Sequence, residues 1–222
     1  MLLRLLLRNF ERMTTMVNSA KLIEMLKTIS AKIEEEKLFL TELDNVIGDG
    51  DHGINMARGF SKVEEKLPTL EGKDCGTILK TVGMTLVSTV GGASGPLYGT
   101  AFMKAGAAVA GKEEITMDDF FKMMDDAVAG IMQRGKSTTG EKTMLDSICP
   151  ALEAMKAEYG ASSDAKAALA AGVKAAEEGI EFTKTIAATK GRACYVGERS
   201  IGHQDPGATS FTMMLTIIAE MA

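Results

Sequence analysis

The chain has 222 residues, 45% of them hydrophobic, which is enough apolar material to bury the core of one large domain or two small ones. Its formal net charge is −5 and it has no basic run, which argues against nucleic acid and anionic membranes as partners. Its three cysteines, far apart and odd in number, form neither a disulfide framework nor a zinc motif, and they predict a cytoplasmic protein.

The first eight residues are an apolar stretch interrupted by Arg4 and Arg8. This stretch is too short to span a membrane, and no small-residue cleavage site follows it. An ordinary helix start comes only at Asn18 and Ser19. We therefore expect residues 1–17 to be an extension outside the fold and residues 18–222 to form the functional domain.

From that point the sequence predicts one helix after another. Apolar residues at three- and four-residue spacing predict a first helix that ends near Leu43, and Pro68 ends a second one after Lys66. Further helices are expected at about 75–90, 96–109, 116–132, 143–159, 164–189 and 205–222. No stretch alternates with a period of two. The sequence thus predicts an all-α fold, a barrel or bundle of about eight antiparallel amphipathic helices.

The segment between the first two helices is the most informative part of the chain. Residues 44–53 read Asp-Asn-Val-Ile-Gly-Asp-Gly-Asp-His-Gly, so Asp44, Asp49 and Asp51 lie close together, separated by glycines. A small set of carboxylate oxygens suits Mg²⁺ shared with a phosphate better than a closed Ca²⁺ cage. The alternative is a plain surface turn that carries a helix N-cap.

Two familiar motifs resemble this loop without matching it. The segment Gly48–Gly53 fits the dinucleotide pattern G-x-G-x-x-G, but its two aspartates would repel a phosphate unless a metal lay between them. If the loop is counted as an EF-hand from Asp49, Ile54 stands at the glycine position and Phe60 at the final glutamate position. We reject both interpretations.

Three other loops are rich in glycine and polar residues, namely 91–96, 134–143 and 191–207. In a bundle that alternates up and down, the loops after the first, third, fifth and seventh helices gather at one end, and these are the acidic loop and the three glycine-rich loops. Glycine-rich loops that lead into helix N-termini are suited to holding phosphate. Close packing of two helices is the alternative for Gly91–Gly95.

The 134–143 loop is no Walker A motif, because Glu141 interrupts the pattern. We expect its lysines, Lys136 and Lys142, to be solvated. Charge neutralisation of a bound phosphate would then depend on a metal, assisted by Arg192. The two histidines of the chain, at positions 52 and 203, both lie in these loops, and we expect them to form hydrogen bonds rather than to act in acid–base catalysis.

Four motifs in this order, at residues 44–56, 91–100, 140–146 and 191–208, resemble the nucleotide-binding (DhaL-type) subunits of dihydroxyacetone kinases. The resemblance covers residues 18–222 and implies an all-α barrel with the nucleotide in loops at one end. It implies that ADP or ATP is the cofactor, with two Mg²⁺ ions bound by Asp44, Asp49 and Asp51. The nucleotide-binding residues that it implies are His52, Gly53, Ile54, Asn55, Ala93, Ser94, Gly135, Met144, Arg192, Asp205, Pro206 and Gly207.

A stand-alone chain resembles the phosphoenolpyruvate-dependent members of this family. There, a phosphotransferase-system subunit (DhaM) would rephosphorylate the bound ADP, and the phosphoryl group would pass to dihydroxyacetone on a second subunit (DhaK). We assign no catalytic residue to this chain, and a homodimer remains open. Two alternatives also remain: the nucleotide domain of a fatty-acid-kinase-like enzyme, and a non-catalytic regulator that senses nucleotide.

Overall fold

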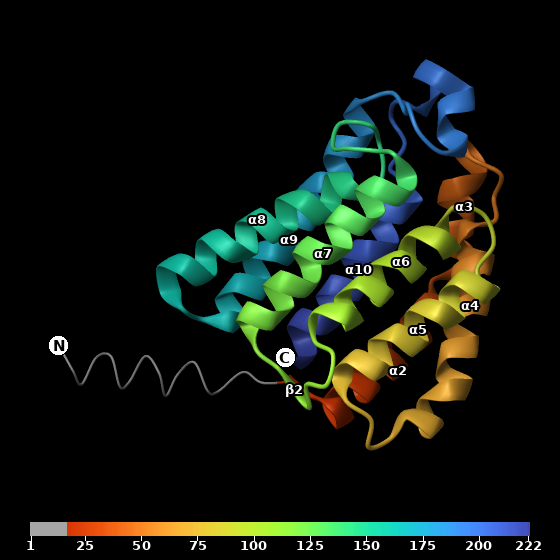
Figure 1. Ribbon diagram of the computed structural model, residues 1–222. Coiled ribbons are helices and arrows are strands. Elements are labelled where there is room, and N and C mark those ends of the chain that lie inside the picture. The colour runs from red at the N-terminus through yellow and green to blue at the C-terminus, as the bar shows by residue number, and fades with distance from the viewer. Residues whose placement is uncertain (1–16) are drawn as a thin grey trace.

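The computed structural model describes residues 17–222, which contain nine α-helices and one pair of two-residue strands (Figure 1). The elements in chain order are β1 (Val17–Asn18), α2 (Ser19–Glu35), α3 (Lys37–Ile47), α4 (His52–Lys66), the 3₁₀ helix η1 (Leu67–Leu70), α5 (Cys75–Thr89), α6 (Ser94–Ala108), β2 (Glu114–Ile115), α7 (Met117–Gly135), α8 (Leu145–Ser162), α9 (Ala165–Thr185), the 3₁₀ segment η2 (Arg192–Ser200) and α10 (Pro206–Met221).

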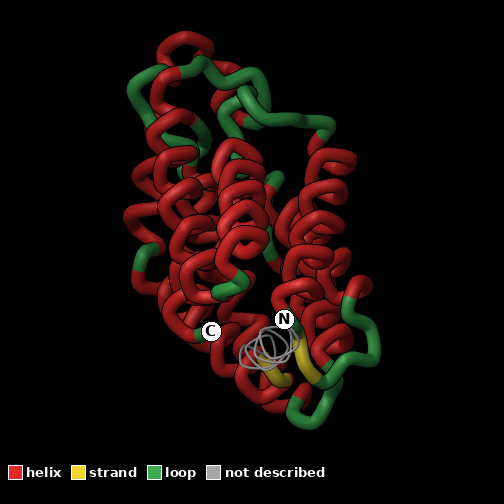
Figure 2. The backbone as a smooth tube through the Cα atoms, turned by 90° about the vertical axis from the view of Figure 1, so that its left-hand side faces the viewer, coloured by secondary structure: helices red, strands yellow, loops and turns green. Residues whose placement is uncertain are grey.

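The helices form a closed barrel. Starting at α2, each of α4, α5, α6, α7, α8, α9 and α10 packs against the next, and α10 returns to α2. Figure 2 shows most of the helices running along a common direction, with loops gathered at the top and the short strands at the opposite end. The expected all-α barrel is therefore confirmed.

The first helix differs from the prediction, because the chain breaks it at Glu36 into α2 and α3. Glu36 has φ −90° and ψ 8°, yet its N–H still donates to the Lys32 carbonyl at 3.0 Å. Both α2 and α3 pack against α4 on one side and α10 on the other. The two helices therefore fill one position of the barrel, and the barrel has the expected number of positions, about eight.

The proposed N-terminal extension lies outside the described residues, except for Val17. Val17 pairs with Ile115 in an antiparallel strand pair, and it packs against the core. Val17, which the prediction assigned to the extension, therefore belongs to the folded part of the chain. No helix within residues 17–222 is long and apolar enough to cross a lipid bilayer.

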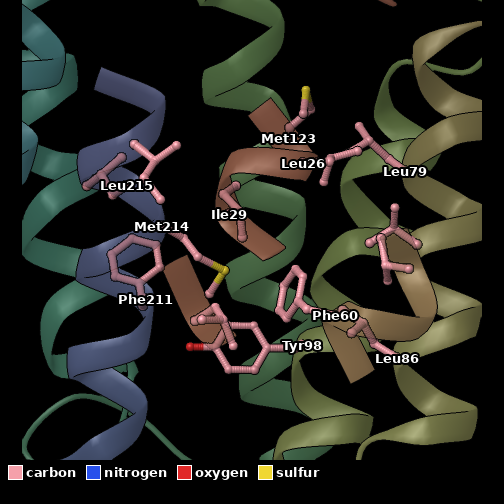
Figure 3. Packing of buried hydrophobic residues seen from close by; sticks show 14 of the residues in the cluster. Leu26, Ile29, Phe60, Leu79, Leu86, Tyr98, Met123, Phe211, Met214 and Leu215 are labelled. Atoms are coloured by element: carbon pink, nitrogen blue, oxygen red, sulfur yellow. The ribbon is translucent and has the colours of Figure 1, made fainter. Parts of the chain in front are cut away.

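The core fills the inside of the barrel. Figure 3 shows side chains from α2, α4, α5, α6, α7 and α10 pointing toward a common centre, among them the fully buried Phe60 of α4. An apolar cavity of about 170 Å³ remains inside this core. Three of its lining residues, Tyr98, Ile131 and Met144, also line the larger cavity described next, so the core forms the floor of that cavity.

Candidate nucleotide and metal site

The four unusual loops meet at one end of the barrel, far from the C-terminus (Figure 1). They surround a cavity of about 570 Å³. Three helices begin at its wall: α4 with His52, α6 with Ser94 and α10 with Pro206. A helix N-terminus has free N–H groups and the positive end of the helix dipole, so this arrangement favours an anionic ligand.

The acidic loop forms one side of this cavity. One carboxylate oxygen from each of Asp44, Asp49 and Asp51 lies within 4.8 Å of the others. Burial, followed by the negative charge of Asp49, raises the pKa of the Asp51 carboxyl. The crowded carboxylates thus repel one another, and a cation among them would relieve this repulsion. The oxygen donors and their spacing fit Mg²⁺.

Asp44 also shapes the loop. Its Oδ2 accepts hydrogen bonds from the backbone N–H groups of Asp51 at 2.9 Å and His52 at 3.1 Å, which fixes the start of α4. A Cβ at Gly48 would lie 2.0 Å from Asp44 Oδ1, so the chain needs a glycine there. Gly50 has φ +70°, a backbone conformation that glycine adopts at little cost.

Arg192, at the start of η2, also lines the cavity and lies beside the acidic loop. Its Nε lies 3.0 Å from Asp49 Oδ2, which joins the start of η2 to the acidic loop. Both side chains are solvent-exposed, so this ion pair contributes little to stability. The position of the Arg192 guanidinium matters for ligand binding, because an arginine beside a carboxylate cluster can also bind a phosphate.

His52 connects the starts of three helices. Its Nδ1 lies 2.9 Å from Ser94 Oγ and its Nε2 lies 3.0 Å from Ser210 Oγ, while the Tyr98 hydroxyl lies 2.7 Å from the same Ser210 oxygen. Burial lowers the pKa of His52 to about 4, so the ring is neutral at pH 7 and its two nitrogens act as one donor and one acceptor. As expected, His52 forms hydrogen bonds here.

The structure brings most of the expected site residues to one cavity. The three aspartates line it, together with His52, Ala93, Ser94, Gly135, Met144, Arg192, Asp205, Pro206 and Gly207.

Gly53, Ile54 and Asn55 do not line the cavity. Gly53 and Ile54 follow His52 along α4, and each helical residue is rotated about 100° from the previous one, so these two residues turn away from the cavity. Asn55 lies on the same helix face as His52, but its Oδ1 accepts a hydrogen bond from Arg58 Nη2 at 2.7 Å. Gly53 faces α3, where a Cβ would lie 2.0 Å from the Lys37 carbonyl oxygen. Ile54 is half exposed on the outside of the barrel, and Asn55 is buried.

One residue at this site, Lys142, has no distinguishing signal in the sequence. We expected it to be solvated, and this was wrong: Lys142 lines the cavity wall and is 1% exposed. Tyr98 and Asp146 lie inside motifs that the sequence analysis singled out, yet neither was assigned a role. Asp146 is buried and accepts a hydrogen bond from the Thr143 N–H at 2.8 Å, which holds the α7–α8 loop in place.

One protein-family model matches most of this chain. The family model described as the DAK2 domain matches residues 46–220. The chain belongs to the DAK2 domain family. The matched DAK2 region contains Asp49 and Asp51 of the acidic loop and all three glycine-rich loops.

Two curated relatives match this chain over most of their own length. The chain is 49% identical over 184 residues to the "PEP-dependent dihydroxyacetone kinase, ADP-binding subunit DhaL" of Escherichia coli (strain K12), covering 83% of this chain and 88% of that protein. It is 42% identical over 199 residues to the "PTS-dependent dihydroxyacetone kinase, ADP-binding subunit DhaL" of Lactococcus lactis, covering 90% and 95% of the two chains.

Among solved structures, the DAK2 fold of this chain is similar to the dihydroxyacetone kinase of C. freundii in complex with AMP-PNP and Mg²⁺. The TM-score is 0.71 at 24% sequence identity, and the match covers 94% of this chain and 35% of that one. At this identity the similarity concerns the fold alone. The larger protein therefore contains the same barrel as one of its parts.

Proposed function

We propose that this chain is the ADP-binding, phosphoryl-transferring subunit of a phosphoenolpyruvate-dependent dihydroxyacetone kinase. The observation that carries the proposal is the convergence of three carboxylates and three helix N-termini on one open cavity in a DAK2 domain. The subunits from E. coli and L. lactis support it, because the similarity spans most of each chain. The fatty-acid-kinase-like and sensor alternatives have no such support.

In this proposal ADP or ATP occupies the cavity with its phosphates toward the acidic loop. Asp44, Asp49 and Asp51 would hold two Mg²⁺ ions, whose charge neutralises the phosphates. The N-terminus of α6 would donate backbone N–H groups to phosphate oxygens, and at the start of α10 the Gly207 N–H could do the same, since Pro206 has no N–H and Asp205 takes the Ala208 N–H. Gly135 and Met144, which also line the cavity, would border the base and sugar.

The chemistry left to this chain is orientation and charge stabilisation of a phosphoryl group, because phosphoryl transfer needs little covalent work from the protein. A DhaM-like phosphotransferase-system subunit rephosphorylates ADP in place. The phosphoryl group then passes to dihydroxyacetone held on a DhaK-like subunit, giving dihydroxyacetone phosphate. The base for the substrate hydroxyl belongs to that partner, and both partners approach through the open mouth of the cavity.

Activity measurements with defined partners test the proposal. The chain with ATP, Mg²⁺ and dihydroxyacetone should give no product above background. Adding the dihydroxyacetone-binding subunit should allow at most one turnover per loaded ATP, and repeated turnover should require the phosphotransferase subunit and phosphoenolpyruvate. Steady turnover by this chain alone would overturn the proposal.

Native mass spectrometry of the purified chain gives an independent measurement. We expect ADP and two Mg²⁺ ions to remain bound. Bound ADP that partner subunits cannot turn over would instead favour a nucleotide sensor, and a chain that retains no nucleotide would contradict the cofactor role of ADP.

A further inference from the structure

Lys142 is a charged residue in the wall of the cavity with almost no exposure to solvent, 1%. Its Nζ donates to three main-chain carbonyls, those of Thr183, Ile186 (3.4 Å) and His203. Thr183 and Ile186 lie at the C-terminal end of α9, where carbonyls lack partners within the helix and have partial negative charge. Lys142 therefore caps α9 from a different loop.

An ammonium group has three N–H donors, and in Lys142 all three are directed to carbonyl oxygens. No donor remains for a phosphate, although the residue lines the cavity. Lys142 can therefore influence a bound nucleotide only through the main chain that it holds.

The segments that Lys142 joins carry residues of the proposed nucleotide site. His203 lies two residues before Asp205, whose side chain accepts from the Ala208 N–H at 2.7 Å and caps α10. The connection that begins at Ile186 leads into η2, which contains Arg192. One ammonium thus ties the α7–α8 loop to both the start of α10 and the segment that leads to Arg192.

The surroundings of Lys142 fit a residue held in a fixed position. Its φ is +60°, a left-handed conformation that is uncommon for lysine and that the surrounding contacts must maintain. Burial lowers its pKa, and the negative charges of Asp205 and Asp146 oppose this shift. Next to it, the Glu141 carbonyl accepts a hydrogen bond from the Thr189 N–H at 3.3 Å, a second tie between the same two loops.

We propose that Lys142 is a positioning residue of the nucleotide site, which sets the start of α10 and the approach to Arg192 by holding three main-chain carbonyls. This inference rests on the proposed function, because the ligand whose binding it supports is ADP with Mg²⁺.

The experiment compares two substitutions of the same kind in the full chain. Lys142→Met keeps an unbranched side chain of similar length and removes the ammonium. Lys136→Met is the matched control, because Lys136 is exposed and also has a left-handed backbone, with φ +48°. ADP affinity is measured by calorimetry with excess Mg²⁺, at a temperature where circular dichroism shows each variant fully helical.

We expect ADP to bind Lys142→Met about 10–100-fold more weakly, the usual effect of removing a group that orients direct ligands. Lys136→Met should bind ADP within about twofold of the wild type. Lys142→Gly is a second variant, suited to the left-handed backbone and thus to folding. It should show the same loss, and added propylammonium chloride should restore part of the affinity where sodium chloride at equal ionic strength does not.

The outcomes separate the inference from the proposed function. If wild-type chain binds ADP and both folded variants bind it equally well, the inference is wrong and the proposed function stands. The inference is also wrong if the variants lose only thermal stability, because Lys142 would then be structural. If the wild-type chain binds no ADP, the proposed function fails first and the inference fails with it.

Discussion

At the scale of single residues, the acidic loop serves ligand binding more than folding. Asp49 is exposed and Asp51 is half-buried, and both contribute negative charge to a cluster that lacks a lysine partner among the described residues. Replacing either carboxylate with an amide removes a repulsive charge and keeps nearly the same shape. The loop's main internal hydrogen bonds use the Asp44 side chain and are left in place.

We therefore predict that Asp49→Asn and Asp51→Asn lose Mg²⁺-dependent ADP binding by more than about tenfold. The free energy of unfolding without ligand should change by less than about 1 kcal/mol, because the groups are partly solvated. Calorimetry and urea denaturation measure the two effects. The control is Asp118→Asn, because Asp118 is an exposed carboxylate that lies far from the cavity residues in the sequence. Unchanged ADP affinity in both loop variants would refute the metal assignment.

At the scale of helices, close backbone contact between α5 and α6 sets the position of the glycine-rich loop that joins them. A Cβ at Gly83 would lie 2.6 Å from the Gly99 carbonyl oxygen, closer than real Cβ contacts allow. Gly83→Ala should push the two helices apart and reduce the free energy of unfolding by about 1–3 kcal/mol. Denaturant unfolding checks this value.

Gly160 in α8 provides the matched control, since a Cβ there would meet nothing within 4 Å. Gly160→Ala should be neutral or should stabilise the chain by up to about 1 kcal/mol, because alanine favours helix more than glycine does. If the two substitutions had equal effects, close α5–α6 contact would not be what requires Gly83.

Asp74 gives a pH-dependent test at the N-terminus of α5. Its carboxylate accepts from the N–H groups of Thr77 at 3.0 Å and Gly111 at 2.9 Å, and from the Thr77 hydroxyl. These hydrogen bonds, above all those from Thr77, lower its pKa from 3.8 to about 2. Because the folded pKa lies below the unfolded one, the carboxylate stabilises the fold above about pH 4, and this contribution is lost as the pH falls toward 2.

Asp74→Ala should cost about 1 kcal/mol at pH 7, the usual effect of removing an N-cap. The difference from the wild type should shrink between pH 4 and pH 2, as the wild-type carboxyl becomes protonated. Urea denaturation at several pH values measures it, with Glu177→Ala, an exposed carboxylate in the middle of α9, as a control that should change little. A difference that stays constant down to pH 2 would show that the charge of Asp74 is unimportant.

The helices also show what can be predicted from local sequence and what cannot. The apolar periodicity predicted the helices, but it could not show the break at Glu36, because residues 32–37 are good helix formers throughout. The break follows from packing, since α2 and α3 both have to remain in contact with α4 and α10.

At the scale of the whole molecule, ligand binding should increase the stability of the chain against unfolding. A ligand that binds only the folded chain stabilises it by about 2.7 kcal/mol at a hundredfold excess over Kd. For a domain of this size that corresponds to a rise in Tm of roughly 5–10 °C. ADP with Mg²⁺ should produce this rise, and EDTA should reverse it. A rise that survives EDTA would contradict a site in which metal lies between the aspartates and the phosphates.

The sequence by itself determined the class of fold, the acidic loop and the end of the barrel at which the site lies. These features depend on neighbours along the chain: helical periodicity, glycine spacing, and the alternation that sends every second loop to the same end. Asp44, Asp49 and Asp51 could be singled out because a cluster of carboxylates between glycines is visible within a few positions.

Only the tertiary structure decided which side chains meet. His52 lies between Ser94 and Ser210, which are 42 and 158 positions away, and Lys142 reaches His203 across 61 positions. No local pattern distinguishes the buried Lys142 from the exposed Lys136 in the same loop. Burial is set by segments that are distant in the sequence. Inside the low-dielectric environment that these segments create, an unpaired charge is costly, so a buried charge needs hydrogen-bond partners.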